Sequence, residues 1–236
     1  MAPLREFRSL DRRYENDTEV NLLRRFYLIF EGVNTEKKYF YGIDSYRKEI
    51  GINSLIEIVI LNKEDEIRNY SNPKKLLELI NLKKDELKKD DKYDDEIDRF
   101  VIVFDRDSFE VEESYLKFID KACQENIIAV TSPCFEIWLL LHYEEVLEKY
   151  IYPNKIKIIE NKKVSSTHSY ISKLCSDISG VNPKNNVNFS KIRNDINMAI
   201  EQEKSIVQNP KIMFGDIGSN IGILIEDMKK DPRNSF

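Results

Sequence analysis

Residues 99–107 read RFVIVFDRD, an apolar run that ends in two aspartates. Arg99–Phe104 is rich in β-branched and aromatic residues and lacks polar alternation, which is typical of a strand covered on both faces. Similar runs lie at Arg25–Glu31, Leu55–Leu61 and Ile127–Val130. Because helical segments separate these runs, the pattern predicts an α/β fold with a parallel sheet of about four strands flanked by helices.

The helices of this core are predicted from periodicity and capping signals. They cover Glu36–Lys48, Pro73–Lys89, Val111–Gln124 and a segment from Pro133 to about Lys149. Two of them begin with a polar N-cap followed by proline, a common way for a helix to start.

The pattern changes after Tyr150. Residues 151–164 are mixed and allow a strand or a hairpin arm, whereas three later segments are helical in pattern: Thr167–Ile178, Phe189–Gln208 and Ser219–Lys230. We therefore expect an N-terminal arm (1–20), a core (21–150) and a mainly helical C-terminal lobe (151–236) packed on the sheet.

Composition narrows the function classes. The 236 residues are 41% hydrophobic and 33% charged with a net charge of −5, which fits a globular protein and argues against a histone-like coat for nucleic acid. The three cysteines form no C-x-x-C pair, which argues against a zinc site or a disulfide framework. The charged start lacks a signal peptide, and the longest apolar stretch, within 137–141, is far too short to span a membrane. We expect a cytoplasmic protein without a membrane partner.

Three acidic residues stand where predicted strands end. Glu31 closes the first strand, and Asp105 and Asp107 follow the third. Active sites of open parallel sheets form outside the carboxyl ends of the strands. Asp105 and Asp107 point the same way if the chain stays extended, and two such carboxylates are costly unless a cation or a proton neutralises them. A sparse set of oxygen ligands suits Mg²⁺ (or Mn²⁺), which keeps several waters when bound.

Each of these acids also has a simpler explanation. Asp105 or Asp107 could cap the helix that starts near Val111, and Glu31 could be a charge on the rim. Glu36 and Glu136 could join the metal site, or each could stabilise a helix N-terminus, which favours an acid by ~0.3–1 kcal/mol.

His142 is a further candidate, as a general base. It lies four residues after Trp138 on the same helix face. The more common role of a histidine in such a position is that of a packed, hydrogen-bonded side chain, and we expect that role here.

Charge along the chain is uneven. Residues 149–173 hold six lysines and one acid, with tyrosines and His168 interleaved. Lysines that track phosphates beside aromatic rings are typical of single-stranded nucleic-acid binding, although an ordinary lysine surface explains the run equally well. The candidates for nucleic-acid binding are Lys155, Lys157, Lys162, Lys163 and His168.

Three motifs in order resemble the RloB family: FEGVNTEKKYF (30–40), VFDRDSF (103–109) and SPCFEIWLLLHY (132–143). These are Toprim-domain proteins associated with restriction-modification loci and, in the AbiL type, with abortive infection against phage. The resemblance spans about residues 20–150. The family usually has Asn-Pro-Cys-Phe-Glu where this chain begins with Ser132, which we expect to cap the following helix in place of the asparagine.

The resemblance implies a Toprim-like core in which Glu31, Asp105 and Asp107 bind Mg²⁺ and serve phosphodiester cleavage or transfer. We expect a Mg²⁺-dependent nuclease that acts on DNA or RNA as the effector of an anti-phage abortive-infection system. The alternative is a non-catalytic regulatory or sensor subunit that docks an ATPase partner, because genes of this family often lie beside an ATPase gene. The sequence leaves the oligomeric state open, a homo-oligomer included.

Overall fold

The computed structural model describes residues 23–32, 34–61, 73–166, 168–183 and 185–235, and all statements below concern these residues. The predicted N-terminal arm (1–20) lies outside them. No helix in this part of the chain has both the length and the apolar character needed to cross a membrane.

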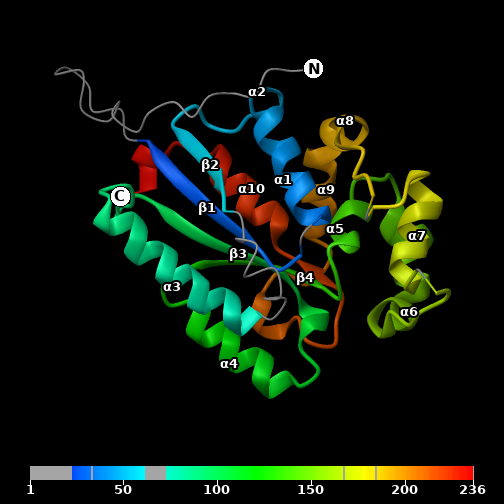
Figure 1. Ribbon diagram of the computed structural model, residues 1–236. Coiled ribbons are helices and arrows are strands. Elements are labelled where there is room, and N and C mark those ends of the chain that lie inside the picture. The colour runs from blue at the N-terminus through cyan, green and yellow to red at the C-terminus, as the bar shows by residue number, and fades with distance from the viewer. Residues whose placement is uncertain (1–22, 33, 62–72, 167, 184, 236) are drawn as a thin grey trace.

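A five-stranded sheet in the order β2-β1-β3-β4-β5 forms the centre of the molecule (Figure 1). Four strands run parallel and coincide closely with the predicted ones: β1 (Arg24–Phe30), β2 (Ile56–Ile60), β3 (Arg99–Asp105) and β4 (Ile127–Ser132). The parallel α/β core is therefore confirmed. The central residues of its strands are mostly apolar because helices cover both faces.

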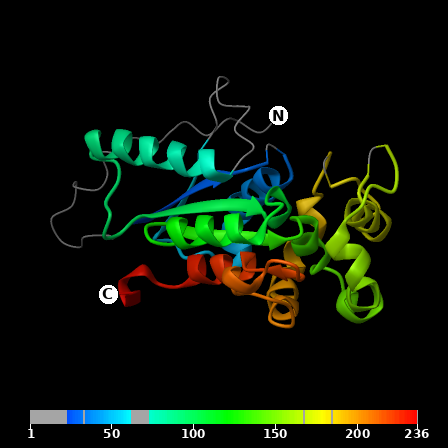
Figure 2. The same ribbon diagram turned by 90° about the horizontal axis from the view of Figure 1, so that it is seen from below.

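Two clusters of apolar side chains pack on the two faces of the sheet. Figure 2 shows the sheet nearly edge-on with helices on either side. One face is covered by α3 (Pro73–Lys89) and α4 (Glu112–Ala122). The other face is covered by α1 (Thr35–Ser45), α5 (Glu136–Leu140), α9 (Ile196–Glu203) and α10 (Ile221–Lys229). The remaining helices are α2 (Arg47–Ile50), α6 (Lys155–Glu160), α7 (Tyr170–Ser179) and α8 (Phe189–Ile192).

The helix predicted from Pro133 to Lys149 is broken. It ends at Leu140 in α5, and a separate π-helical turn covers Leu147–Ile151. Two features explain the break. The side-chain Nε2 of Gln202 donates hydrogen bonds to the carbonyls of Leu141 and Tyr143. These carbonyls would otherwise have continued the helical ladder. In addition, Glu145 has a left-handed φ of 57°, which a continuing helix does not allow.

The C-terminal part of the chain packs on the sheet and also adds a strand to it. Gly218–Ser219 forms β5, a short antiparallel strand on β4 that was not predicted. Next to it, the side-chain amide of Asn220 accepts from Val130 N–H (2.7 Å) and donates to the Ile128 carbonyl (2.7 Å). Asn220 thus extends the hydrogen bonding of β4 as a strand residue would.

The mixed segment 151–164 holds no strand element or hairpin: it is a 3₁₀ turn (Tyr152–Asn154) followed by α6. Its only ladder contact is an isolated bridge between Lys163 and Ser169. In both views, α6 and α7 lie beyond the carboxyl ends of the parallel strands. The basic segment therefore lies on the side of the molecule where the acidic candidates are found.

Candidate active site at the carboxyl edge of the sheet

Asp105 is the last residue of β3 and lies opposite Thr131 of β4. The hydroxyl of Thr131 donates to Asp105 Oδ1 at 2.7 Å, which fixes the orientation of the carboxyl group. Asp105 has the parity of Val101 and Val103, whose side chains pack on the face that α1 and α5 cover. The side chain therefore points toward the N-terminal ends of these two helices.

Four carboxyl groups interact at this point, and we call Asp105, Glu36, Asp107 and Glu136 the acidic cluster. Burial raises the pKa of Asp105 well above its usual range, and the negative charges of Glu36, Asp107 and Glu136 raise it further. The pKa of the buried Cys134 thiol is raised as well, first by burial and then by the charge of Glu136. A cation is the natural neutraliser of such a cluster.

Glu36 is buried at the start of α1, with 6% of its surface exposed. Its carboxylate lies directly against the Cα atom of Gly32: a Cβ atom added there would be 2.5 Å from Oε2 and 2.6 Å from Oε1. Any larger residue at position 32 would push this carboxylate aside. The absence of a side chain at Gly32 therefore allows the carboxylate of Glu36 to pack against the turn between β1 and α1.

Glu136 occupies the corresponding place at the start of α5, with 8% exposed. Helix α5 has only five residues, so its dipole alone gives little reason to bury a carboxylate there. The charge of Glu136 acts on Asp105, as that of Glu36 does. The starts of α1 and α5 therefore lie near the end of β3.

Glu31 follows β1, where the alternation of β1 directs it toward the opposite face of the sheet from Asp105. Glu31 Oε2 accepts from the backbone N–H of Asp105 at 3.2 Å, and Oε1 accepts from the hydroxyl of Ser108. Glu31 thus fixes the turn after β3. Neither bond excludes Glu31 as a metal ligand, so that role stays a prediction.

Asp107 is exposed and belongs to a 3₁₀ turn, Arg106–Ser108. Its backbone N–H donates to the Pro133 carbonyl at 3.1 Å, which ties the turn after β3 to the chain that follows β4. The capping alternative is wrong: α4 begins after Val111 and receives no side-chain cap, and Asp105 does not cap the 3₁₀ turn. The two aspartates are not explained by helix capping.

A bound divalent ion needs several oxygen ligands that converge on one point. Within the described parts of the chain, no three His, Cys, Asp or Glu side chains converge closely enough to form a complete metal cage. The chemistry of the acidic cluster nevertheless suits Mg²⁺ or Mn²⁺, since all four groups supply oxygen and Mg²⁺ commonly binds one or two carboxylates and keeps its waters. The cluster therefore fits a largely hydrated ion.

Two other sequence predictions have clear outcomes. His142 is buried, with Nδ1 on the Trp138 carbonyl (3.0 Å) and Nε2 on the Tyr39 hydroxyl (3.1 Å), and burial lowers its pKa to about 4. It is the packed histidine that we expected. The prediction that Ser132 caps the following helix is wrong, because its hydroxyl donates to the Asp216 carbonyl at 2.5 Å and α5 has no side-chain cap.

The basic candidates lie on and after α6. Lys155 pairs with Asp216 at 2.8 Å, and Lys162 pairs with Glu160 at 3.0 Å. Lys157 lies over the ring of Tyr170, 5.9 Å from its centre, and Lys163 is exposed. His168 is half-buried, with its ring nitrogens beside Ser165 and Asn182. Of these five residues, Lys155 has the closest described link to the sheet edge.

Sequence reasoning missed Arg106 as a site residue. Its Nε donates to the hydroxyl of Ser132 (3.2 Å), and its guanidinium lies 5.4 Å from the ring centre of Phe214. The position of Arg106 between two aspartates was the available signal, but its anchors lie 26 and 108 residues further along the chain. Thr131 was missed for a similar reason, because its partner is fixed only by the pairing of β3 with β4.

The mostly parallel five-stranded sheet, with helices on both faces and acids at its carboxyl edge, is consistent with a Toprim-like fold. A family model described as RloB-like protein matches residues 26–228, which is most of the chain. The protein therefore belongs to the RloB-like family. No curated protein and no solved structure matches the chain.

Proposed function

We propose that the protein is a Mg²⁺-dependent phosphodiesterase that cleaves nucleic acid at the acidic cluster. The observation that carries this proposal is the position of Asp105, whose desolvated carboxyl group faces three further carboxylates at the edge where parallel sheets form active sites. A protein rarely gathers several acids around one buried carboxyl group without a function for them.

The residues of the chain have separable roles in this proposal. Asp105 and Asp107 would hold the ion, with Glu36 and Glu136 as further or water-mediated ligands. Bound there, the ion would activate a water and stabilise the leaving oxygen. Thr131 orients Asp105, and Glu31 holds the turn that carries both aspartates. Lys157, Lys162 and Lys163 would contact the phosphates of the substrate.

A cleavage assay tests this proposal. Purified protein is incubated with plasmid, single-stranded DNA and total tRNA in Mg²⁺ or Mn²⁺, with EDTA as the blank. We expect Asp105→Asn to abolish cleavage while the melting temperature is retained. The exposed Asp90, which pairs with Lys92, gives a matched control, Asp90→Asn. Full activity of Asp105→Asn would refute the role of Asp105.

One observation favours the second candidate, a regulatory subunit that docks an ATPase. The described residues form no complete metal cage, and a scaffold protein would not need such a cage. The two candidates differ in one outcome: a regulatory protein keeps its biological effect when Asp105 and Asp107 are both changed to asparagine, and a nuclease loses it.

We place the activity in defence against phage on the strength of the family resemblance. The test is the plating efficiency of phage on cells that carry the wild-type gene or the Asp105→Asn, Asp107→Asn variant, each with the neighbouring genes of its locus. Protection by the wild type alone supports a nuclease effector, and equal plating on both strains and on empty cells contradicts the defence role.

A further inference from the structure

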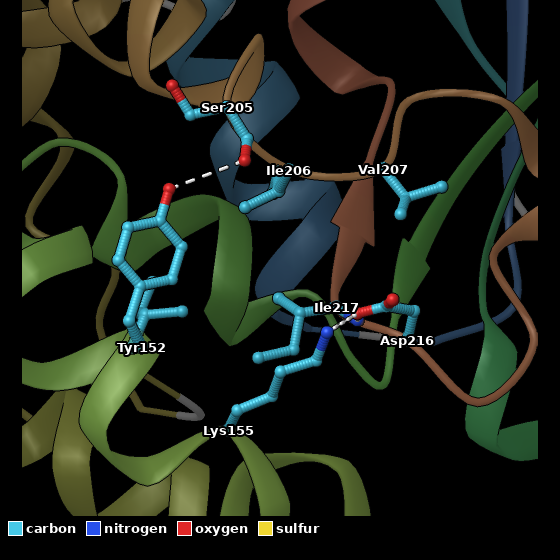
Figure 3. A pocket seen from close by; sticks show the side chains of 8 residues that line it. Tyr152, Lys155, Ser205, Ile206, Val207, Asp216 and Ile217 are labelled. Carbon is cyan, nitrogen blue, oxygen red and sulfur yellow. Dashed lines mark hydrogen bonds and ion pairs between the residues drawn. The ribbon is translucent and has the colours of Figure 1, made fainter.

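A pocket of about 200 Å³ lies where the C-terminal segments meet the sheet edge (Figure 3). Ile151, Ile206, Val207 and Ile217 supply apolar walls. The volume is well below the ~300–1,000 Å³ of sites for drug-sized ligands, so the pocket takes one small ring system.

The polar groups of the pocket are paired and electrically balanced. Lys155 Nζ contacts Asp216 Oδ1 at 2.8 Å, and the same oxygen accepts from the Ile217 N–H at 2.7 Å. The Lys155 ammonium keeps the pKa of Asp216 below its usual range, after the opposing effect of burial. One positive and one negative charge side by side do not select an anion, so a free phosphate is a poor fit.

Tyr152 supplies an aromatic ring on one side of this pocket. Figure 3 shows its hydroxyl directed at the carbonyl of Ser205, a bond of 3.4 Å, while Lys155 points at Asp216. The ring is 47% exposed, so a planar group can approach it without displacing other side chains. An aromatic ring beside hydrogen-bonding groups of both kinds is the usual arrangement for holding an unpaired base.

A short chain of contacts joins this pocket to Asp105. The carbonyl of Asp216 accepts from the hydroxyl of Ser132, which in turn accepts from Nε of Arg106, the residue after Asp105. Through Thr131, Asp105 and Ser219 are separated by two strand spacings of the sheet, which is about 10 Å, and Ile217 of the pocket lies two residues before Ser219. This separation lies within the reach of one or two nucleotides.

We propose that this pocket binds one unpaired nucleobase of the strand whose phosphodiester lies at the acidic cluster. The inference rests on the proposed function and narrows its substrate to a nucleic acid with an unpaired nucleotide near the cleaved bond. The base stacks on Tyr152 and makes hydrogen bonds with Lys155 and Asp216. Arg106, whose Nε is held by Ser132 and whose guanidinium lies on Phe214, contacts a neighbouring phosphate of the same strand.

Binding of matched oligonucleotides tests the pocket. Fluorescence anisotropy is measured in EDTA at one salt concentration, with a single-stranded 12-nucleotide probe and an abasic probe that has the same phosphates. The probe is made as DNA and as RNA, which separates the two sources of the base. We expect Tyr152→Ala to weaken binding of the base-bearing probe roughly 5- to 100-fold and to leave the abasic probe unchanged. Tyr152→Phe should bind as wild type.

Tyr150→Ala is the matched control, because Tyr150 is also exposed but does not line the pocket. A second variant, Asp216→Asn, should reduce the differences in affinity among homopolymers of the four bases, even if Tyr152→Ala proves unstable. If Tyr152→Ala affects both probes alike, or neither, the base pocket is refuted while cleavage at Asp105 stands. If the wild type binds no probe, the pocket and the proposed function both fail.

Discussion

The substitution Gly32→Ala separates the role of the acidic cluster from its contribution to stability. A Cβ atom at this position would lie 2.5 Å from Oε2 of Glu36, where ordinary contacts are 3.4–4 Å. The carboxylate must therefore move by about 1 Å. A misplacement of about 1 Å can cost ~100-fold in rate, so we expect a loss of that order in kcat/KM.

The same substitution should hardly change the free energy of unfolding. Gly32 has no left-handed φ, so alanine is compatible with the backbone and contributes ~0.4–1 kcal/mol of stability through the unfolded state. The group that must move is the end of a flexible side chain, and an off-rotamer glutamate costs ~0.5–1.5 kcal/mol. The two effects nearly cancel, to within about 1 kcal/mol.

The assay pairs cleavage kinetics with calorimetric titration of Mn²⁺, and a thermal melt checks the fold. Glu36→Gln is the matched variant, because it keeps the volume of Glu36 and removes its charge. We expect both variants to weaken Mn²⁺ binding and cleavage together. If Gly32→Ala binds Mn²⁺ and cleaves as the wild type does, Glu36 is only a stabiliser of the start of α1, and the reasoning is refuted.

Three other variants test separate parts of the structure. Burial and neighbouring charges raise the pKa of Asp105, so without divalent ions its ionisation lowers stability as the pH rises from the unfolded pKa of about 4 through the raised folded pKa. Over that range the melting temperature of Asp105→Asn should fall less than that of the wild type. A steeper loss in the variant would contradict this sign. Thr131→Val should lower cleavage about 10-fold at unchanged substrate affinity, because Asp105 loses its 2.7 Å hydrogen bond; an unchanged rate in a kinetic assay would show that Thr131 is not needed for orientation. Glu203→Ala should destabilise by about 2–4 kcal/mol in a denaturant melt, because the buried carboxylate accepts from Ser219 and Gly222, whereas the exposed Glu201→Ala should stay within about 0.5 kcal/mol. Equal effects of these last two would refute the role of the buried contacts.

The parallel core could be predicted because local pattern and tertiary role agree there. β3 is apolar from Phe100 to Phe104 and α3 begins at Pro73, so the local pattern locates both elements. The break after α5 could not be predicted, since it depends on Gln202, which lies 61 residues beyond the carbonyl of Leu141 that it binds. β5 has two residues, too few for any periodicity.

The candidate site divides in the same way. Asp105 could be found because it directly follows an unmistakable strand. Glu36 and Glu136 could be named as candidates from their places near helix starts, but the choice between a metal site and a capping role depends on the packing of α1 and α5 around Asp105. Glu31 shows the converse: its place after β1 was predictable, but its bonds to the Asp105 amide and to Ser108 depend on the pairing of β1 with β3.

Crystals of the protein soaked in Mn²⁺ and measured at the manganese absorption edge would locate the ion directly. We expect one anomalous peak about 2.0–2.2 Å from a carboxylate oxygen of Asp105, with other cluster oxygens or waters completing the shell, and no peak there in the Asp105→Asn variant. Active wild-type protein that shows no peak at Asp105, or a peak that persists in the variant, would contradict a metal-dependent nuclease built on this cluster.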